Sequence, residues 1–124
     1  MTPAIANETD LLGLALAILD GEIPMPGGRA PRAAAVVARQ ALEEAIAARC
    51  ASVASLVQRP TTRCQLILLR YDEPQIGKVA QIAWDGLSRA CHHHAYELQP
   101  SDSEVRALIQ LVAKVNGREA NFAP

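Results

Sequence analysis

The chain has 124 residues, half of them apolar, and a formal net charge of -1. This length and apolar content suffice for one hydrophobic core but not for two. Aromatic residues make up only 3%, so the core must consist of Ala, Leu, Ile and Val. Such small side chains favour closely packed helices over a sandwich or barrel. The slight negative charge argues against non-specific binding of long nucleic acid.

Basic residues are unevenly placed despite the low net charge. Arg29, Arg32 and Arg39 gather around the start of one predicted helix, and Arg59 and Arg63 flank the next loop. Solvated arginines are the simpler interpretation of this pattern, and a local basic patch is the alternative.

The cysteine pattern and the N-terminal segment point to a cytoplasmic protein. Cys50, Cys64 and Cys91 are odd in number and lack C-x-x-C spacing, so neither a disulfide framework nor a zinc finger is indicated. The apolar run 11–19 is too short to span a bilayer, and the segment before it lacks the positive charge of a signal peptide. We expect reduced thiols, no export and no membrane anchor.

The first predicted helix extends from a cap at Asn7 or Thr9 to about Asp20, and Gly21 ends it. Its apolar residues recur at helical spacing: Leu11, Leu12, Ala15, Leu16 and Leu19. The segment 21–30 that follows is rich in Pro and Gly and is predicted to be a loop.

The second predicted helix is the longest. Pro31 suits its first turn, where the missing N–H is not needed, and Arg59-Pro60 stops it. Its apolar stripe is spaced by threes and fours and comprises Ala35, Ala38, Leu42, Ile46, Cys50, Val53 and Val57.

A short helix is predicted for 63–71, beginning at Thr61 or Thr62. The run Leu66–Leu69 is also compatible with a buried strand, but no partner strand is visible elsewhere in the sequence. As a helix, the segment would bury one face made of Cys64, Ile67, Leu68 and Tyr71.

Two more helices are predicted in the C-terminal part. The first starts at 72–74. Its predicted buried face, which includes His94, comprises Ile76, Ala80, Ala83, Leu87, Cys91, His94 and Leu98. Pro100 then interrupts the chain. Ser101 and Glu104 form a capping box for the last helix, which Gly117 ends.

These elements predict an all-α fold, an up-and-down four-helix bundle with one additional short helix. Short connections between consecutive helices make them antiparallel neighbours. One domain would cover 1–124, with loose ends at 1–7 and 117–124.

Reactive side chains crowd together at 87–98, in the sequence LSRACHHHAYEL. Three imidazoles can bind zinc, but helical ligands usually lie at i and i+4, and consecutive histidines diverge by about 100°. Because the sequence offers no second group of ligands, we predict no metal site.

Acid–base chemistry is a second interpretation of this segment. An imidazole that titrates near neutrality can move a proton, and the guanidinium of Arg89 can hold a phosphate, which suits phosphodiester cleavage. A purely structural interpretation has a core His94, solvated His92 and His93, and Arg89 paired with Asp85 at i, i+4.

Two segments resemble the HEPN family, small all-helical domains that include many metal-independent ribonucleases of toxin, CRISPR and phage-defence systems. The segment 32–46 looks like the family's long Ala-rich helix with its Gln-Ala-x-Glu core. Arg89, followed by four residues and then His94, is similar to the R-x4-6-H motif of the nuclease members.

The resemblance implies a homodimer that cleaves RNA without metal or cofactor by activating the ribose 2′-hydroxyl. Arg89 would hold the scissile phosphate, and His94 would act as general acid or base. His92, Tyr96 and Arg39 are candidate substrate-binding residues. Members without the chemistry imply the alternative, a binding or dimerisation module whose partner is a protein such as an antitoxin or a nucleotidyltransferase.

The sequence departs from the family pattern in two respects. Ala90 stands where the family commonly has a polar residue. A regular helix would also point Arg89 and His94 about 140° apart, so either the helix breaks or a second subunit completes the site. His93, about 40° from Arg89, is the alternative catalytic partner.

Overall fold

The computed structural model describes residues 10–51, 60–92 and 98–117, and within them every regular element is helical. The helices are α2 (Leu11–Leu19), α3 (Ala30–Arg49), α5 (Thr62–Asp72), α6 (Pro74–Cys91) and α7 (Asp102–Val115), with a 3-10 turn η1 (Pro26–Gly28). The all-α prediction is confirmed, and so is the helical interpretation of 63–71. None of the helices in the described ranges is long and apolar enough to cross a membrane.

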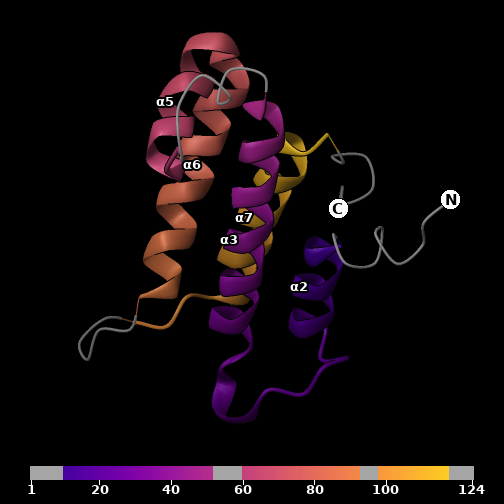
Figure 1. The fold of residues 1–124 in the computed structure, drawn as a ribbon. Coiled ribbons are helices and arrows are strands. Elements are labelled where there is room, and N and C mark those ends of the chain that lie inside the picture. Colours follow the sequence, from indigo (N-terminus) through magenta and orange to yellow (C-terminus); the bar gives the residue numbers. More distant parts are fainter. Residues whose placement is uncertain (1–9, 52–59, 93–97, 118–124) are drawn as a thin grey trace, which may run out of the picture.

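Helix α3 lies at the centre of the packing. It contacts α2, α5, α6 and α7, and α6 in turn packs against α5 and α7. In Figure 1, α3 and α7 run from the lower to the upper end, whereas α2 and α6 run downward. The end of α6 and the start of α3 therefore lie at the same, lower end of the molecule.

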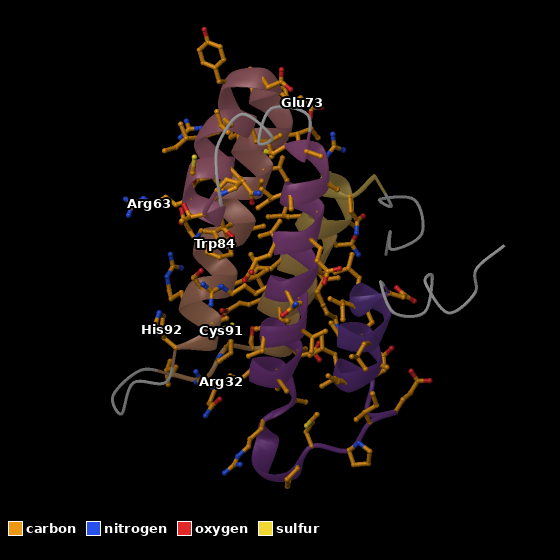
Figure 2. The ribbon with its side chains drawn as sticks, viewed as in Figure 1. Arg32, Arg63, Glu73, Trp84, Cys91 and His92 are labelled. Atoms are coloured by element: carbon orange, nitrogen blue, oxygen red, sulfur yellow. The ribbon has the colours of Figure 1, made fainter. Side chains whose placement is uncertain are left out.

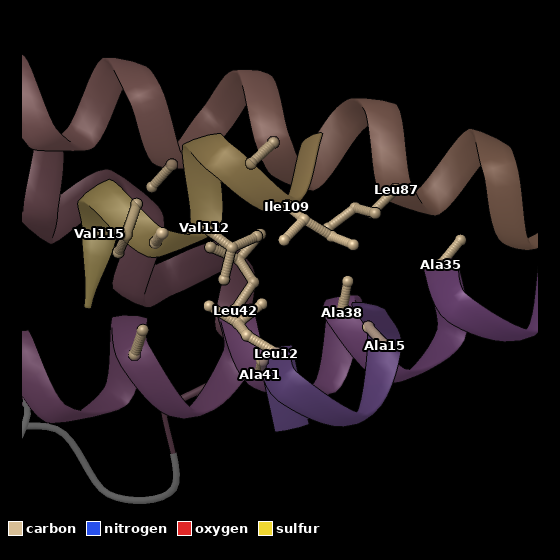
Figure 3. Packing of buried hydrophobic residues seen from close by; sticks show 14 of the residues in the cluster. Leu12, Ala15, Ala35, Ala38, Ala41, Leu42, Leu87, Ile109, Val112 and Val115 are labelled. Atoms are coloured by element: carbon tan, nitrogen blue, oxygen red, sulfur yellow. The ribbon is translucent and has the colours of Figure 1, made fainter. Parts of the chain in front are cut away.

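The core joins these helices through small and branched aliphatic side chains (Figure 3). Ala15, Ala35 and Ala38 are completely buried, and they allow α2 and α3 to pack closely beside Leu42. The core therefore consists of the aliphatic residues that the composition predicts.

Helix α6 approaches the backbone of α5 closely at Gly77. A Cβ atom at this position would lie 2.5 Å from the backbone Cα of Arg70, much closer than two carbon atoms can approach. On α5, Leu66 and Leu69 are the buried large apolar side chains. The predicted buried face of α5 is therefore wrong, since Ile67 and Tyr71 on it are 65% and 92% exposed.

The starts of the helices depend on local caps. Thr61 caps α5 by accepting from the Cys64 N–H, and Ser101 caps α7 by accepting from the Glu104 N–H, both at 3.1 Å. Both caps agree with the sequence prediction. The predicted cap of α2, Asn7 or Thr9, is wrong. Asp10 is the N-cap, and its side chain accepts from the Gly13 N–H at 3.1 Å. Asn7 and Thr9 lie outside the described part of the chain.

Helix α3 ends ten residues earlier than predicted. It stops at Arg49, with Cys50 as its C-cap, rather than at Arg59. Arg49 reaches α7 by donating to the Val115 carbonyl and pairs with Glu73 at 3.0 Å. These contacts join the end of α3 to α7 and to Glu73 between α5 and α6. The stripe residues expected at 53 and 57 lie outside the described residues.

Helix α6 also ends early, at Cys91 rather than near Leu98. His92 is extended, with φ -74° and ψ 138°. Leu98 is 95% exposed, so its predicted core position is wrong. The prediction that His94 lies on the buried face of this helix assumed helical spacing, and α6 ends before His94.

Candidate functional site

The candidate site lies where α6 ends, next to the start of α3. Arg89 occupies the last turn of α6, and His92 is its C-cap; both side chains are exposed. Arg29 and Arg32 come from the start of α3. Figure 2 shows Arg32, Cys91 and His92 at this lower end of the molecule. The structure thus joins the predicted basic patch to the predicted reactive segment.

Arg32 holds the end of α6 in place. Its guanidinium donates to the backbone carbonyls of Ala90, at 3.4 Å, and His92, and also to the side-chain oxygen of Gln99, at 3.3 Å. The last carbonyls of a helix lack intrahelical donors and carry partial negative charge. A cation from α3 therefore satisfies the end of α6 and positions His92.

A pocket of about 490 Å³ opens between α6 and α7 beside Arg89. Its apolar wall comes mainly from the first half of α7, and Arg89, His92, Gln99 and Glu104 supply polar groups. Its lining residues are Gly86, Arg89, Ala90, His92, Leu98, Gln99, Pro100, Glu104, Ala107, Leu108 and Leu111. A concave apolar site with a few converging polar groups suits a small organic ligand or part of a larger one.

A second hollow of about 420 Å³ lies on the other side of Gln99. It is lined by Arg29, Arg32, Ala33, Val36 and Gln99. Gln99 borders both hollows and accepts a hydrogen bond from Arg32, which lines the second. Arginines therefore line both hollows, an arrangement that can contact successive phosphates of a polyanion.

Arg89 does not form the ion pair that the structural interpretation requires. Asp85 accepts instead from the Gln81 side-chain nitrogen at 3.0 Å. The ion pairs found in the described part of the chain involve Arg49 and Arg106. The expected i, i+4 pairing of Arg89 with Asp85 is therefore wrong, and the Arg89 guanidinium faces solvent beside the pocket.

The predicted site residues divide into three groups. Arg89 and His92 lie together at the pocket. His93, His94 and Tyr96 lie outside the described residues. Since α6 ends at Cys91, the divergence of about 140° that a continuous helix would impose between Arg89 and His94 does not apply.

Arg39 lies elsewhere. Its guanidinium stacks on the Trp84 ring, 4.4 Å from the centroid, and Trp84 is five residues before Arg89 on α6, about 140° around the helix. Arg39 thus lies on the opposite flank of α6 from the pocket, and the structure does not bring it to Arg89.

The Arg39 flank contains partly buried polar groups that the sequence did not suggest as a cluster. Arg39 Nε and Ser88 Oγ are buried, and neither has a hydrogen-bond partner within the described ranges. Burial raises the pKa of the Cys91 thiol, although the charges of Arg39 and Arg32 act in the opposite direction. The spacing of Trp84, Ser88 and Cys91, at i, i+4 and i+7, was the available signal.

Gln99 and Glu104 also line the pocket, a role that the sequence pattern does not indicate for either residue. Glu104 was assigned only to the capping box. The hydrogen bonds of the described residues include the one that Ser101 accepts from the Glu104 N–H, but not the reciprocal one that the Glu104 carboxylate would accept from the Ser101 N–H. That carboxylate is therefore not committed to the cap, and it borders the pocket.

No group of three or more His, Cys, Asp or Glu residues suited to a metal ion occurs among the residues that the structure describes. The chain matches no protein-family model, and no curated protein and no solved structure is significantly similar to it.

Proposed function

We propose that this protein is a HEPN-like ribonuclease that cleaves RNA without a metal ion at the lower end of the molecule. The observation that carries the proposal is the placement of Arg89. It is exposed, has no carboxylate partner among the described residues, and lies with His92 at a pocket beside the arginines of α3.

Arg89 would hold the scissile phosphate and stabilise the negative charge of the transition state. A histidine from the run 92–94 would take the proton of the ribose 2′-hydroxyl, while O2′ bonds to phosphorus and the bond from phosphorus to O5′ breaks. The departing O5′ takes a proton from a second acid, which is a second histidine or its copy in a partner chain. The products are a 2′,3′-cyclic phosphate and a 5′-hydroxyl.

The proposal also includes the bundle topology, the oligomeric state and the biological setting. Helices α2, α3, α6 and α7 would form an up-and-down four-helix bundle, with α5 as the additional helix. A homodimer would bring a second set of histidines to Arg89. A cytoplasmic toxin or defence system, with an antitoxin or nucleotidyltransferase as partner, is the setting that the resemblance favours.

Product chemistry tests this mechanism. Purified protein is incubated with a short single-stranded RNA in EDTA, and the ends of the fragments are analysed by mass spectrometry. We expect cyclic phosphate and 5′-hydroxyl ends. Fragments with 5′-phosphate ends, or cleavage that needs added magnesium, would contradict the proposal.

A non-catalytic HEPN-like binding module is the second candidate. The observation that favours it is the commitment of Arg32 to the carbonyls of α6, since this arginine serves the fold. The module predicts that the basic end binds a protein partner and that every RNA stays intact. Arg89-dependent cleavage would reject it.

A further inference from the structure

The pocket between α6 and α7 has more capacity than a phosphate needs. A phosphate requires only the Arg89 guanidinium and a histidine, whereas the pocket also has an apolar wall of α7 formed by Ala107, Leu108 and Leu111. From Glu104 to Leu111 this wall extends about 10 Å along the helix. A volume of about 490 Å³ is in the range of small-ligand sites. The phosphate would therefore be bound together with an apolar-faced group.

In RNA, the group that adjoins each phosphate and has apolar faces is the base. Protein sites for single-stranded RNA take unstacked bases between apolar surfaces and recognise their edges by hydrogen bonds. Leu108 and Pro100 offer such surfaces here. The polar groups at the pocket then decide which base edge fits.

Glu104 supplies a carboxylate, which accepts hydrogen bonds only. Among the four bases, guanine alone presents two adjacent N–H donors, N1–H and the N2 amino group, and these match the two oxygens of a carboxylate. Adenine and cytosine pair one donor with an acceptor, and that acceptor would face the carboxylate unfavourably.

Gln99 complements this preference. Its side-chain oxygen accepts from Arg32 at 3.3 Å, so the amide nitrogen is the part of Gln99 that remains to donate. Guanine carries a carbonyl, O6, next to N1–H on the same edge. A donor beside a carboxylate is the combination that this edge requires.

We infer that the pocket between α6 and α7 binds a guanine base, with Glu104 as the residue that determines specificity, next to the phosphate held at Arg89. This inference rests on the proposed RNA substrate, and it assigns cleavage to the phosphate that follows a guanosine.

Nucleotide binding tests the pocket separately from catalysis. The four ribonucleoside 3′-monophosphates are titrated against the full chain by calorimetry. We expect guanosine 3′-monophosphate to bind about tenfold more tightly than the other three, the value of one good bidentate contact. Equal affinities, or no binding by any nucleotide to a protein that cleaves RNA, would overturn the inference and leave the proposed function intact.

Two substitutions identify the pocket as the site. Glu104→Gln keeps the shape but replaces one acceptor by a donor, so it should remove the preference for guanosine over the other nucleotides. Ala107→Phe should fill the pocket and weaken guanosine 3′-monophosphate at least about tenfold. Ala47→Phe, at an exposed position of α3 outside the pocket, is the matched control and should bind like wild type.

Cleavage positions separate the two proposals. A set of RNAs is used, each with a single guanosine in a different sequence context. Wild type should cut them after the guanosine, and Glu104→Gln should cut them without this preference. Cleavage with no preference in wild type would reject the base pocket alone. An RNA that stays intact and unbound would reject the proposed function and, with it, this inference.

Discussion

The Arg32 guanidinium at the start of α3 donates to the Ala90 carbonyl at the end of α6, at 3.4 Å and 58 residues away along the chain. With its bonds to His92 and Gln99, this arginine joins the first turn of one helix to the last turn of another. The position of Arg89 beside the pocket therefore depends on a residue from α3.

Removing this contact should destabilise the protein. We expect Arg32→Ala to lower the free energy of unfolding by about 1–3 kcal/mol, because helix-end carbonyls lose their charged donor. Urea denaturation measures the change. Arg29→Ala, one turn away and exposed, is the matched control and should stay within about 0.5 kcal/mol of wild type. Equal losses of unfolding free energy in both variants would show that Arg32 stabilises the protein through its charge alone and not through its hydrogen bonds.

The two glycines of α6 that face other helices should respond differently to alanine. At Gly77 a Cβ would lie 2.5 Å from the Arg70 backbone, which cannot move without separating α5 from α6. At Gly86 it would lie 2.6 Å from Leu108 Cδ2, the end of a flexible side chain. We expect Gly77→Ala to cost about 1–3 kcal/mol.

For Gly86→Ala, the gain in helix propensity of about 1 kcal/mol should largely offset the displacement of Leu108. Thermal and urea unfolding of both variants checks the difference. A neutral Gly77→Ala would contradict the close packing of α5 against α6.

Substitution of Arg39 should affect stability, whereas substitution of Arg89 should affect RNA cleavage. Trp84 is the only tryptophan, and Arg39 covers its ring, so Arg39→Ala should shift the Trp84 emission to longer wavelength and cost about 1 kcal/mol of stability. RNA cleavage should stay within about twofold of wild type, a change of under 1 kcal/mol. Loss of cleavage at unchanged Trp84 emission would instead place Arg39 in the substrate site.

Alkaline pH should destabilise the protein through two of its thiols, the buried Cys50 and the half-buried Cys91. Burial, followed by the carboxylates of Asp72 and Glu73, raises the pKa of Cys50, and burial raises the pKa of Cys91. The folded state therefore holds these protons more tightly than the unfolded chain. The stability is fully present below the ordinary thiol pKa of 9.0 and is lost as the pH rises toward the folded-state values.

Urea denaturation in reductant between about pH 7 and 10 measures this effect. The wild-type free energy of unfolding should fall more steeply above the ordinary thiol pKa than that of a Cys50→Ala, Cys91→Ala variant. Parallel curves would assign the alkaline loss to other groups.

Local signals predicted the starts of α5 and α7, whereas the ends of α3 and α6, which the sequence missed, make long-range contacts. The caps at Thr61 and Ser101 bond to N–H groups three residues away, so the spacing alone reveals them. At the end of α3, Arg49 donates to Val115, 66 residues away, and at the end of α6, Ala90 accepts from Arg32, 58 residues away. Periodicity has no information about such contacts, and it therefore extended both helices too far.

The candidate site shows the same division. Arg89 and His92 are three residues apart in the chain and were predicted together. Gln99 and Glu104 line the pocket only because α7 packs back against α6. Arg39 is a candidate substrate-binding residue in the sequence, whereas the structure places its guanidinium on Trp84 of another helix, a contact that sequence spacing does not reveal.

The central claim is that Arg89 holds a scissile phosphate, and the cleavage rate of Arg89→Gln tests it most directly. Arg70→Gln is the matched control, because Arg70 is also exposed in the last turn of a helix and lies away from the pocket. Cleavage of total RNA in EDTA is followed for both variants and wild type, with urea denaturation to confirm folding. We predict a loss of at least about a hundredfold for Arg89→Gln and wild-type rates for Arg70→Gln. Equal rates in all three proteins, or RNA left intact by wild type, would contradict the account.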